Sequence, residues 1–466
     1  MSRRLTKSPD SGSLRFSSTP PGNERPVTDG LSRRSKGLLV IVVVALLLPQ
    51  FFTSSWDKAG LPIGLPRVNS GDEPHYLVLI NSLVADGDFE LENNYHSVHA
   101  GSEQAGLYFA GSALDHHTVW PEEGRRVGWE QRFLTDTNKW ERAPDGTPVP
   151  AIRAGQPDKV PEHEYSSHWP GLAVLLAPVL YPMRGTTYLE PAALVCSWVA
   201  TVLALACFVS LAGVFSRRSG TIVVAAALVF VGTPVWHYGR TLFTEPYLVA
   251  CILGAYAALL RRGLPLLSGA LVAIAILLKN PAVLFGLPLG IYLLGQRKWS
   301  QAARFALFPI VAVGVSLLLN DHTSGSSLEG AQVWQSHSFL TGARGVLFDQ
   351  SHGIFPYAPI LISALAGWPA LLRRHRGPAL SVAVSILLYG GLVATYYGWS
   401  GGYCFGPRHV VPLLPLLGLG LIPRLENPLP GIWPRIDIAI LGVTSIVINL
   451  LGALPYWKFW GGHPLF

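Results

Sequence analysis

The sequence is dominated by long apolar runs, which a chain can bury only in a membrane or a very large core. A first run covers 38–52, and others cover roughly 189–215, 221–238, 243–260, 264–279, 281–296, 302–320, 356–372, 379–397, 409–424 and 435–455. A helix needs about 20 apolar residues to cross a bilayer. Only 14% of the residues are charged, against about a quarter in soluble domains. These runs predict an all-α polytopic membrane protein with about eleven transmembrane helices.

The segment before the first run has a different composition. Residues 1–36 are rich in Ser, Pro, Gly and Arg and contain few large apolar side chains. Such a segment buries too little surface to fold alone, so we expect a disordered basic tail. The run 38–52 is short for a span, but the residues after it, Thr53 to Trp56, show no small-residue cleavage site for a signal peptidase. We interpret it as an uncleaved first helix, with residues 37–466 forming one transmembrane domain.

The basic residues of the short loops indicate the orientation, because Lys and Arg accumulate in short cytoplasmic loops. With about eleven spans, the basic residues of the short loops lie on the same side of the membrane as the N-terminal tail. They are Arg217-Arg218, Arg261-Arg262, Arg297-Lys298, the cluster 373–376 and Arg424. This pattern predicts a cytoplasmic N-terminus. A full span at 168–183 would place Arg217-Arg218 on the outer side of the membrane. We therefore expect that stretch to be a half-buried or surface-lying helix of the first external loop.

This topology leaves three extracytoplasmic loops, a long first loop at 54–188, a second at 321–355 and a short one at 398–408. The first loop contains Asp72 and Glu73, soon after the chain leaves the bilayer. Paired carboxylates in this place suggest chemistry at the membrane surface. The alternative is a solvated cap on a surface helix.

Two further charged residues map to the same face. Glu245 precedes Pro246, which is favoured at the start of a helix, so Glu245 is either a helix cap or a second acidic site residue. Arg408 follows Gly406-Pro407 at another helix start, where the helix dipole disfavours a cation. A charge retained there indicates an anionic partner. This partner is either a phosphate, which a guanidinium binds with two hydrogen bonds, or a carboxylate in a structural ion pair.

Arg240 and Lys279 also map to the outer ends of spans. The favoured explanation is that their charged heads snorkel to the interface, and the alternative is a contribution to substrate binding. A carboxylate base, a second acid and a cation at one membrane face meet the requirements for transferring a sugar from a lipid phosphate. The cation holds the phosphate, and the carboxylate takes the proton of an attacking hydroxyl.

Several segments, in order, resemble the GT-C superfamily of integral-membrane glycosyltransferases, in particular its bacterial protein mannosyltransferase and aminoarabinose transferase branch. They span most of 38–425, and each is degenerate alone. The segments are 71–77 (GDEPHYL), 168–172 (HWPGL) with Ala177-Pro178, 232–234 (GTP), 243–246 (FTEP), 345–349 (GVLFD), 353–359 (GIFPYAP) and 402–409 (GYCFGPRH).

The resemblance implies that Asp72 is the catalytic base, that Glu73 is an adjacent acid of variable role and that Glu245 is a second acid. Arg408 is expected to bind the donor phosphate. We also expect substrate contacts from His75, Tyr76, Arg240, Lys279 and Tyr403.

No cofactor is certain from the sequence. Some relatives use a divalent metal, but this chain shows no tight ligand spacing. His75 or His237 could be a ligand, although a hydrogen-bonding role is favoured for each.

The function implied is inverting transfer of a sugar from a polyprenyl-phosphate donor to a lipid, glycan or protein acceptor, on the outer face of a bacterial inner membrane. Two alternatives remain. A transporter or flippase of an anionic lipid or solute would place its charges at mid-membrane and often show repeated halves. A polysaccharide ligase or polymerase would use the same donors on another fold and would not require the acidic pair.

Overall fold

The computed structural model describes residues 32–48, 68, 72–91, 94, 163–186, 188–324, 336–402, 404–426 and 433–453, and the backbone of strand segments at 118–119, 135–142 and 148–152. Tyr403 and most of the predicted N-terminal tail lie outside these residues. So does most of the segment 94–165 of the first loop.

The described part of the chain is mostly helical. The α-helices are α1 (Arg33–Leu47), α2 (Glu73–Ala85), α4 (Gly171–Leu180), α5 (Leu189–Ala212), α6 (Ser219–Val231), α7 (Val235–Tyr238), α8 (Glu245–Tyr256), α9 (Pro265–Leu278), α10 (Val283–Gly295), α11 (Trp299–Ser324), α12 (Phe339–Phe348), α13 (Ile354–Tyr357), α14 (Ile360–Arg374), α15 (Arg376–Ala394), α16 (Leu414–Gly418), α17 (Leu421–Glu426) and α18 (Trp433–Ala453). Short 3₁₀ or π turns are η6 (Tyr181–Met183), η7 (Ala257–Arg261), η8 (Asn280–Ala282) and η9 (Arg408–Leu413). Two antiparallel pairs join β1 (Thr118–Val119) to β4 (Tyr165–Ser166) and β2 (Thr135–Arg142) to β3 (Pro148–Ile152).

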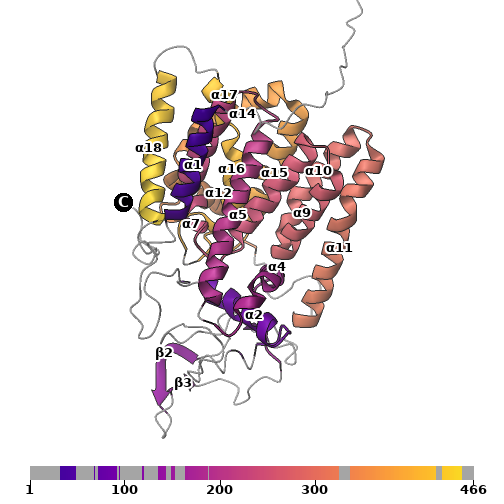
Figure 1. The fold of residues 1–466 in the computed structure, drawn as a ribbon, viewed down its shortest axis with the longest axis vertical. Helices are drawn as coiled ribbons and strands as arrows, with labels where there is room; N and C mark the ends of the chain where they lie inside the picture. Colours follow the sequence, from indigo (N-terminus) through magenta and orange to yellow (C-terminus); the bar gives the residue numbers. More distant parts are fainter. Residues whose placement is uncertain are drawn as a thin grey trace, which may run out of the picture.

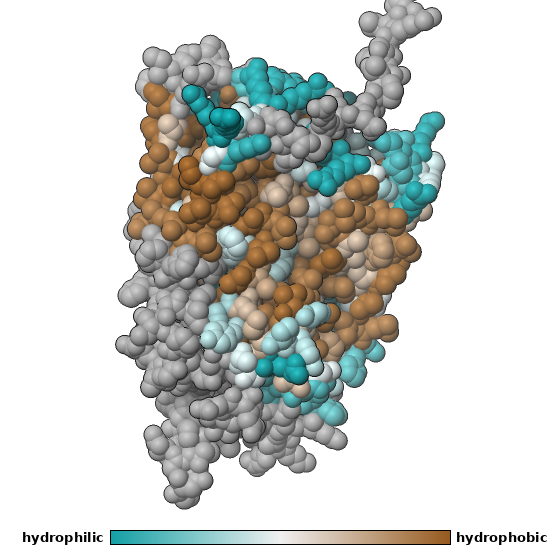
Figure 2. Space-filling view, in the orientation of Figure 1, coloured by the Kyte–Doolittle hydropathy of each residue, from teal (hydrophilic) through white to brown (hydrophobic). Residues whose placement is uncertain are grey.

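The long helices form a bundle with an apolar surface. Five helical segments in the described residues are long and apolar enough to cross a membrane: Leu189–Ala212, Trp299–Thr323, Arg376–Ala394, Arg408–Glu426 and Ile436–Ala453. Figure 2 shows a broad brown band across the middle of the face in view, with hydrophilic residues toward both ends. A broad apolar surface of this kind is stable in contact with the hydrocarbon core of a membrane. The structure therefore supports a multi-pass membrane protein.

Several predicted spans are interrupted rather than continuous. The run 221–238 divides into α6 and α7 around Pro234, and the run 409–424 divides into η9, α16 and α17. Pro412 and Pro415 lie within the second run and lack the N–H group that a regular helix needs. These breaks place charged side chains at helix ends instead of in mid-helix.

The first helix also begins earlier than expected. Ser32 caps α1, and its Oγ accepts a hydrogen bond from the backbone N of Ser35 at 3.1 Å. Side-chain oxygens at this position satisfy an otherwise unpaired N–H group of the first turn. As a result, residues 33–36, which we assigned to the disordered tail, belong to the helix.

The first loop folds against one end of the bundle (Figure 1), where α2 lies next to α4. One side of α4 is buried through Leu172 and Leu176, whereas Val179 on the other side is 62% exposed. This is the half-buried helix expected at 168–183. At the opposite end of the bundle, α14 packs closely against the start of α17. A Cβ atom on Gly367 would lie 1.8 Å from the carbonyl oxygen of Gly420, the residue before α17.

Candidate active site

Asp72 and Glu73 lie at the start of α2, and neither is a solvated cap. Asp72 is the N-cap residue but makes no side-chain capping bond. Its Oδ2 accepts a hydrogen bond from Nη2 of Arg408 and lies 3.6 Å from Nδ1 of His168. Glu73 is buried, and its Oε1 accepts a hydrogen bond from the backbone N of Leu242 at 2.8 Å. The solvated-cap alternative is therefore wrong, because both carboxylates are engaged inside the protein.

Arg408 is the cation at the centre of the site. Its Nη2 is paired with Asp72, its Nε lies 3.4 Å from Oε1 of Glu245, and its guanidinium lies over the ring of Phe243, 4.1 Å from the centroid. A cation over an aromatic face gains electrostatic attraction, more so when it is desolvated. One buried side chain thus joins the acid of the first loop to the acid at the start of α8.

The loop before Arg408 is shaped by glycines. Gly401 and Gly406 have φ angles of +82° and +64°, which L side chains rarely adopt. A Cβ atom on Gly401 would lie 3.0 Å from Cβ of Arg408, and one on Gly406 would lie 2.9 Å from the ring of Tyr357. The loop can therefore turn tightly against η9 and hold Arg408 in place.

Glu245 begins α8 and is fully buried. Besides Arg408, it pairs with Lys279, whose Nζ lies 3.4 Å from Oε1. Lys279 Nζ also donates to Nδ1 of His409 at 3.1 Å. Lys279 is only 7% exposed, so the favoured prediction that it snorkels to the interface is wrong. A buried carboxylate attracts the ammonium group inward more strongly than interfacial water holds it outward.

His237 lies in α7, and Arg240 lies in the turn between α7 and α8. Arg240 is 2% exposed, so snorkelling is also the wrong description of this residue. His237 donates from Nδ1 to the backbone carbonyl of Gly452 at 2.8 Å. This contact agrees with the hydrogen-bonding role favoured for His237.

His75 and Tyr76 pack against His168 of the segment that precedes α4. The His75 and His168 rings are stacked with centroids 5.9 Å apart, and the Tyr76 ring lies 5.1 Å from His168. Burial raises the pKa of the Tyr76 hydroxyl, and the negative charge of Asp72 raises it further. Tyr76 is therefore a neutral phenol throughout the physiological pH range. These three rings form the wall of the site next to Asp72.

The arrangement does not fit a divalent metal between the two acids. The guanidinium of Arg408 already lies between Asp72 and Glu245, and Lys279 approaches Glu245 as well. A divalent metal would need free carboxylate oxygens, and the two cations beside these oxygens would repel it. Among the described residues, moreover, no three His, Cys, Asp or Glu side chains are grouped as metal ligands.

The structure brings together Asp72, Glu73, Glu245, Arg408, Lys279, His75 and Tyr76 from the predicted site. Tyr403 lies outside the described residues. His168, Phe243 and His409 have no role predicted from the sequence, although each lies in a segment that carries the family resemblance. Their contacts with Asp72, Arg408 and Lys279 could not be inferred without the fold.

Comparison with known proteins supports the class that this site suggests. The model of glycosyltransferase family 87 matches residues 170–399, which are 230 of the 466 residues. Comparison with curated proteins gave no match. The matched region contains α8, with Glu245, and Lys279, but neither Asp72 nor Arg408.

Solved structures are similar to this chain at low sequence identity. The structure of ArnT from Cupriavidus metallidurans bound to undecaprenyl phosphate has 15% identity and a TM-score of 0.50, over 87% of this chain and 63% of that chain. The archaeal oligosaccharyltransferase AglB from Archaeoglobus fulgidus, in complex with an inhibitory peptide and a dolichol-phosphate, has 12% identity and a TM-score of 0.47, over 90% of this chain and 55% of that chain. The chain thus spans less than two thirds of either structure.

The fold and the buried charged site define a polytopic membrane protein of the GT-C architecture. The family match and the ArnT fold together confirm the resemblance to GT-C membrane glycosyltransferases that the sequence predicted.

Proposed function

We propose that this protein transfers a sugar, with inversion, from a polyprenyl-phosphate-linked donor to a hydroxyl of a lipid, glycan or protein acceptor at the extracytoplasmic face of a bacterial inner membrane. Asp72 is the general base, and Arg408 binds the donor phosphate. Glu245 holds Arg408 in place, and Lys279 pairs with Glu245. The undecaprenyl phosphate bound in the ArnT structure supports the donor class.

The observation that carries the proposal is the position of Arg408 between Asp72 and Glu245. Without donor, the guanidinium neutralises Asp72, and a carboxylate paired with a cation is a weak base. A phosphate offers the same guanidinium two or more oxygens in a bidentate arrangement. Binding of the donor phosphate would therefore draw Arg408 away from Asp72 and leave that carboxylate able to accept a proton.

The transfer step then follows from these positions. The acceptor oxygen forms a bond to the anomeric carbon, while the bond between that carbon and the phosphate oxygen breaks. The acceptor hydroxyl proton passes to Asp72, and the electron pair of the broken bond leaves with polyprenyl phosphate. Arg408 and Lys279 stabilise the charge that develops on this leaving group, and a buried site makes that stabilisation stronger than it would be in water.

The location of the charges also supports transfer rather than transport. Asp72 starts α2, Glu245 starts α8, Arg408 starts η9, and Lys279 follows the end of α9. A transporter needs charges along a path at mid-membrane. Charges at helix ends instead match a donor whose lipid tail stays in the bilayer and whose phosphate lies at the interface.

The test uses purified protein in detergent with radiolabelled polyprenyl-phospho-mannose and polyprenyl-phospho-arabinose, together with an extract of membrane lipids and glycans as acceptor. Wild type is expected to move label to an acceptor, and Asp72→Asn to reduce that rate by about 10² to 10⁴-fold, the usual loss when a general base is removed. Asp88→Asn is the matched control, because Asp88 lies in the turn after α2, where its Oδ1 accepts from Ser82 Oγ at 3.1 Å.

Donor binding separates a catalytic defect from a folding defect. Asp72→Asn is expected to retain binding of polyprenyl phosphate, because Arg408 remains. Equal turnover by wild type and Asp72→Asn would remove Asp72 from the mechanism. Absence of label transfer by a wild type that binds polyprenyl phosphate would contradict the proposed activity with these donors.

A further inference from the structure

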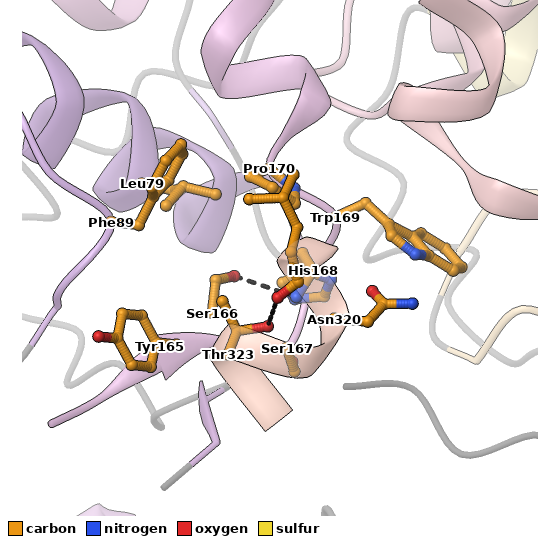
Figure 3. A pocket seen from close by; sticks show the side chains of 11 residues that line it. Leu79, Phe89, Tyr165, Ser166, Ser167, His168, Trp169, Pro170, Asn320 and Thr323 are labelled. Carbon is orange, nitrogen blue, oxygen red and sulfur yellow. Dashed lines mark hydrogen bonds between the residues drawn. The ribbon is translucent and has the colours of Figure 1, made fainter. Parts of the chain in front are cut away.

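A pocket lies beside the candidate active site, between the segment 165–170 and the end of α11. Figure 3 shows its lining side chains grouped around His168, with Trp169 and Asn320 on one side and Ser166, Ser167 and Thr323 nearby. Leu79 of α2, Phe89, Tyr165, Pro170 and Leu319 complete the lining. The pocket is partly open to solvent.

The pocket is anchored on two elements that are distant in sequence. Strand β4 reaches the end of α11 through Tyr165 and His322, whose ring centroids are 5.4 Å apart. Within the loop, the backbone N of His168 donates to Oγ of Ser166 at 3.0 Å. Thr323 Oγ1 donates to the carbonyl of Leu319 at 2.9 Å. These contacts orient the hydroxyl groups of Ser166 and Thr323.

His168 belongs to both the pocket and the charged site. It lines the pocket, and its Nδ1 lies 3.6 Å from Oδ2 of Asp72. No lining residue comes from α8 or η9, the elements that carry Glu245 and Arg408. The pocket therefore adjoins Asp72 through His168, and its lining comes from elements other than those that carry the cations. A lining separate from the cations suits inverting transfer, because the attacking hydroxyl and the departing phosphate lie on opposite faces of the sugar ring.

The lining chemistry matches a sugar ring. An indole offers a flat apolar face, and an amide and several hydroxyls offer both hydrogen-bond donors and acceptors. Asn320 is only 8% exposed, so its amide is surrounded by protein rather than by solvent. A few fixed polar groups beside aromatic surface are the general pattern of small-molecule sites. The described lining contains no Lys, Arg, Asp or Glu, which argues against a second phosphate site.

From this geometry we propose that the pocket is the acceptor subsite and that it binds a pyranose ring whose hydroxyl is presented to Asp72. Trp169 stacks on the apolar face of the ring, Asn320 hydrogen-bonds its hydroxyls, and His168 orients the reacting hydroxyl toward the carboxylate. This inference rests on the proposed function and specifies its acceptor as a glycosyl group, either free or attached to a lipid.

Photo-crosslinking tests the pocket without requiring turnover. Wild-type protein is irradiated with octyl α-D-mannoside, octyl β-D-glucoside and octyl β-D-galactoside, each carrying a diazirine on the sugar, and the labelled peptides are mapped by mass spectrometry. We expect label within 165–170 and 319–323 from at least one glycoside. An octyl diazirine without a sugar is expected to leave these peptides unlabelled.

Variants then assign the contacts. Trp169→Leu and Asn320→Leu are expected to reduce this label at least five-fold, whereas Trp169→Phe retains most of it because an aromatic face remains. Trp198→Leu is the matched control, since Trp198 is a half-buried tryptophan of α5 that does not line the pocket. Competition by the corresponding methyl glycoside would assign the site to the sugar alone, and competition only by the unlabelled octyl glycoside would assign it to a lipid-linked sugar. Label confined to other peptides, or equal label from the probe without sugar, would overturn the proposal.

Kinetics distinguish this inference from the proposed function itself. If wild type transfers sugar, Asn320→Leu is expected to raise the KM for the acceptor about ten-fold and leave the KM for the donor unchanged. A rise in the donor KM alone would contradict the acceptor subsite while leaving the transferase activity intact. Specific crosslinks in a protein without transfer activity would support the sugar pocket and count against the proposed reaction.

Discussion

Arg408 donates a hydrogen bond to Asp72 although 336 residues separate the two. The same guanidinium lies 3.4 Å from Glu245 through its Nε. A planar group with several donors can make both contacts at once, whereas a lysine ammonium acts as a single point charge. This difference gives the first prediction.

Arg408→Lys is expected to fold but to bind the donor at least ten-fold more weakly, because the ammonium cannot hold a phosphate in a bidentate manner. Arg408→Gln is expected to lose donor binding and to be less stable, since Asp72 and the buried Glu245 then lack their shared cation. Equilibrium binding of radiolabelled polyprenyl phosphate and thermal unfolding in detergent measure these effects. Wild-type affinity in Arg408→Lys would contradict a phosphate-binding role.

The Glu245–Lys279 pair provides a double-mutant cycle. Removing one partner of a buried ion pair costs about 3–5 kcal/mol, because the other charge is left uncompensated. Lys279→Met and Glu245→Gln are each expected to lower stability. The loss in free energy of unfolding of the double variant is expected to be about 0.5–3 kcal/mol smaller than the sum of the two single losses, because residues in contact are coupled.

Unfolding of all four proteins in one detergent, followed by tryptophan fluorescence, measures this coupling. Arg373→Met is a control, because Arg373 lies in the last turn of α14, away from the pair. Strict additivity of the two single changes would show that the pair contributes no coupling.

The close approach of α14 and α17 gives a prediction about the fold. Gly367→Ala is expected to destabilise the protein by about 1–3 kcal/mol, because the added methyl group would overlap the Gly420 carbonyl and force the helices apart. Gly391→Ala in α15 is the matched control. Its Cβ would meet no atom within 4 Å, so alanine there is expected to be neutral or to stabilise by about 0.5–1 kcal/mol. Thermal unfolding compares the two, and equal stabilities would contradict the helix spacing.

Cys404 gives a prediction about pH. Burial raises the pKa of its thiol to about 11, although the charge of Arg408 acts in the opposite direction. The thiolate is the reactive form, so only about one molecule in 10³ carries it at pH 8. Alkylation of Cys404 by iodoacetamide is therefore expected to be slow at pH 7.5 and to rise about ten-fold per pH unit up to pH 10. Mass spectrometry of the peptide measures the rate, and rapid labelling at pH 7.5 would contradict the buried position.

The sequence by itself determined the membrane class, the positions of most helices and the identity of the principal charged residues. Hydropathy and short motifs depend on neighbouring residues, so they can be interpreted without a fold. The helical segments that make up the run 409–424 and the half-buried helix at 168–183 illustrate this, since both lie where the apolar pattern predicted.

Only the tertiary structure decided how those charges are used. Lys279 pairs with Glu245 instead of snorkelling, and His168 joins Asp72 to a pocket that reaches the end of α11. Such contacts depend on how helices far apart in the chain pack together and on where proline-containing segments interrupt them. A sequence pattern shows which side chains are charged and near the interface, but the desolvation and pairing that set their roles arise only when the bundle is assembled.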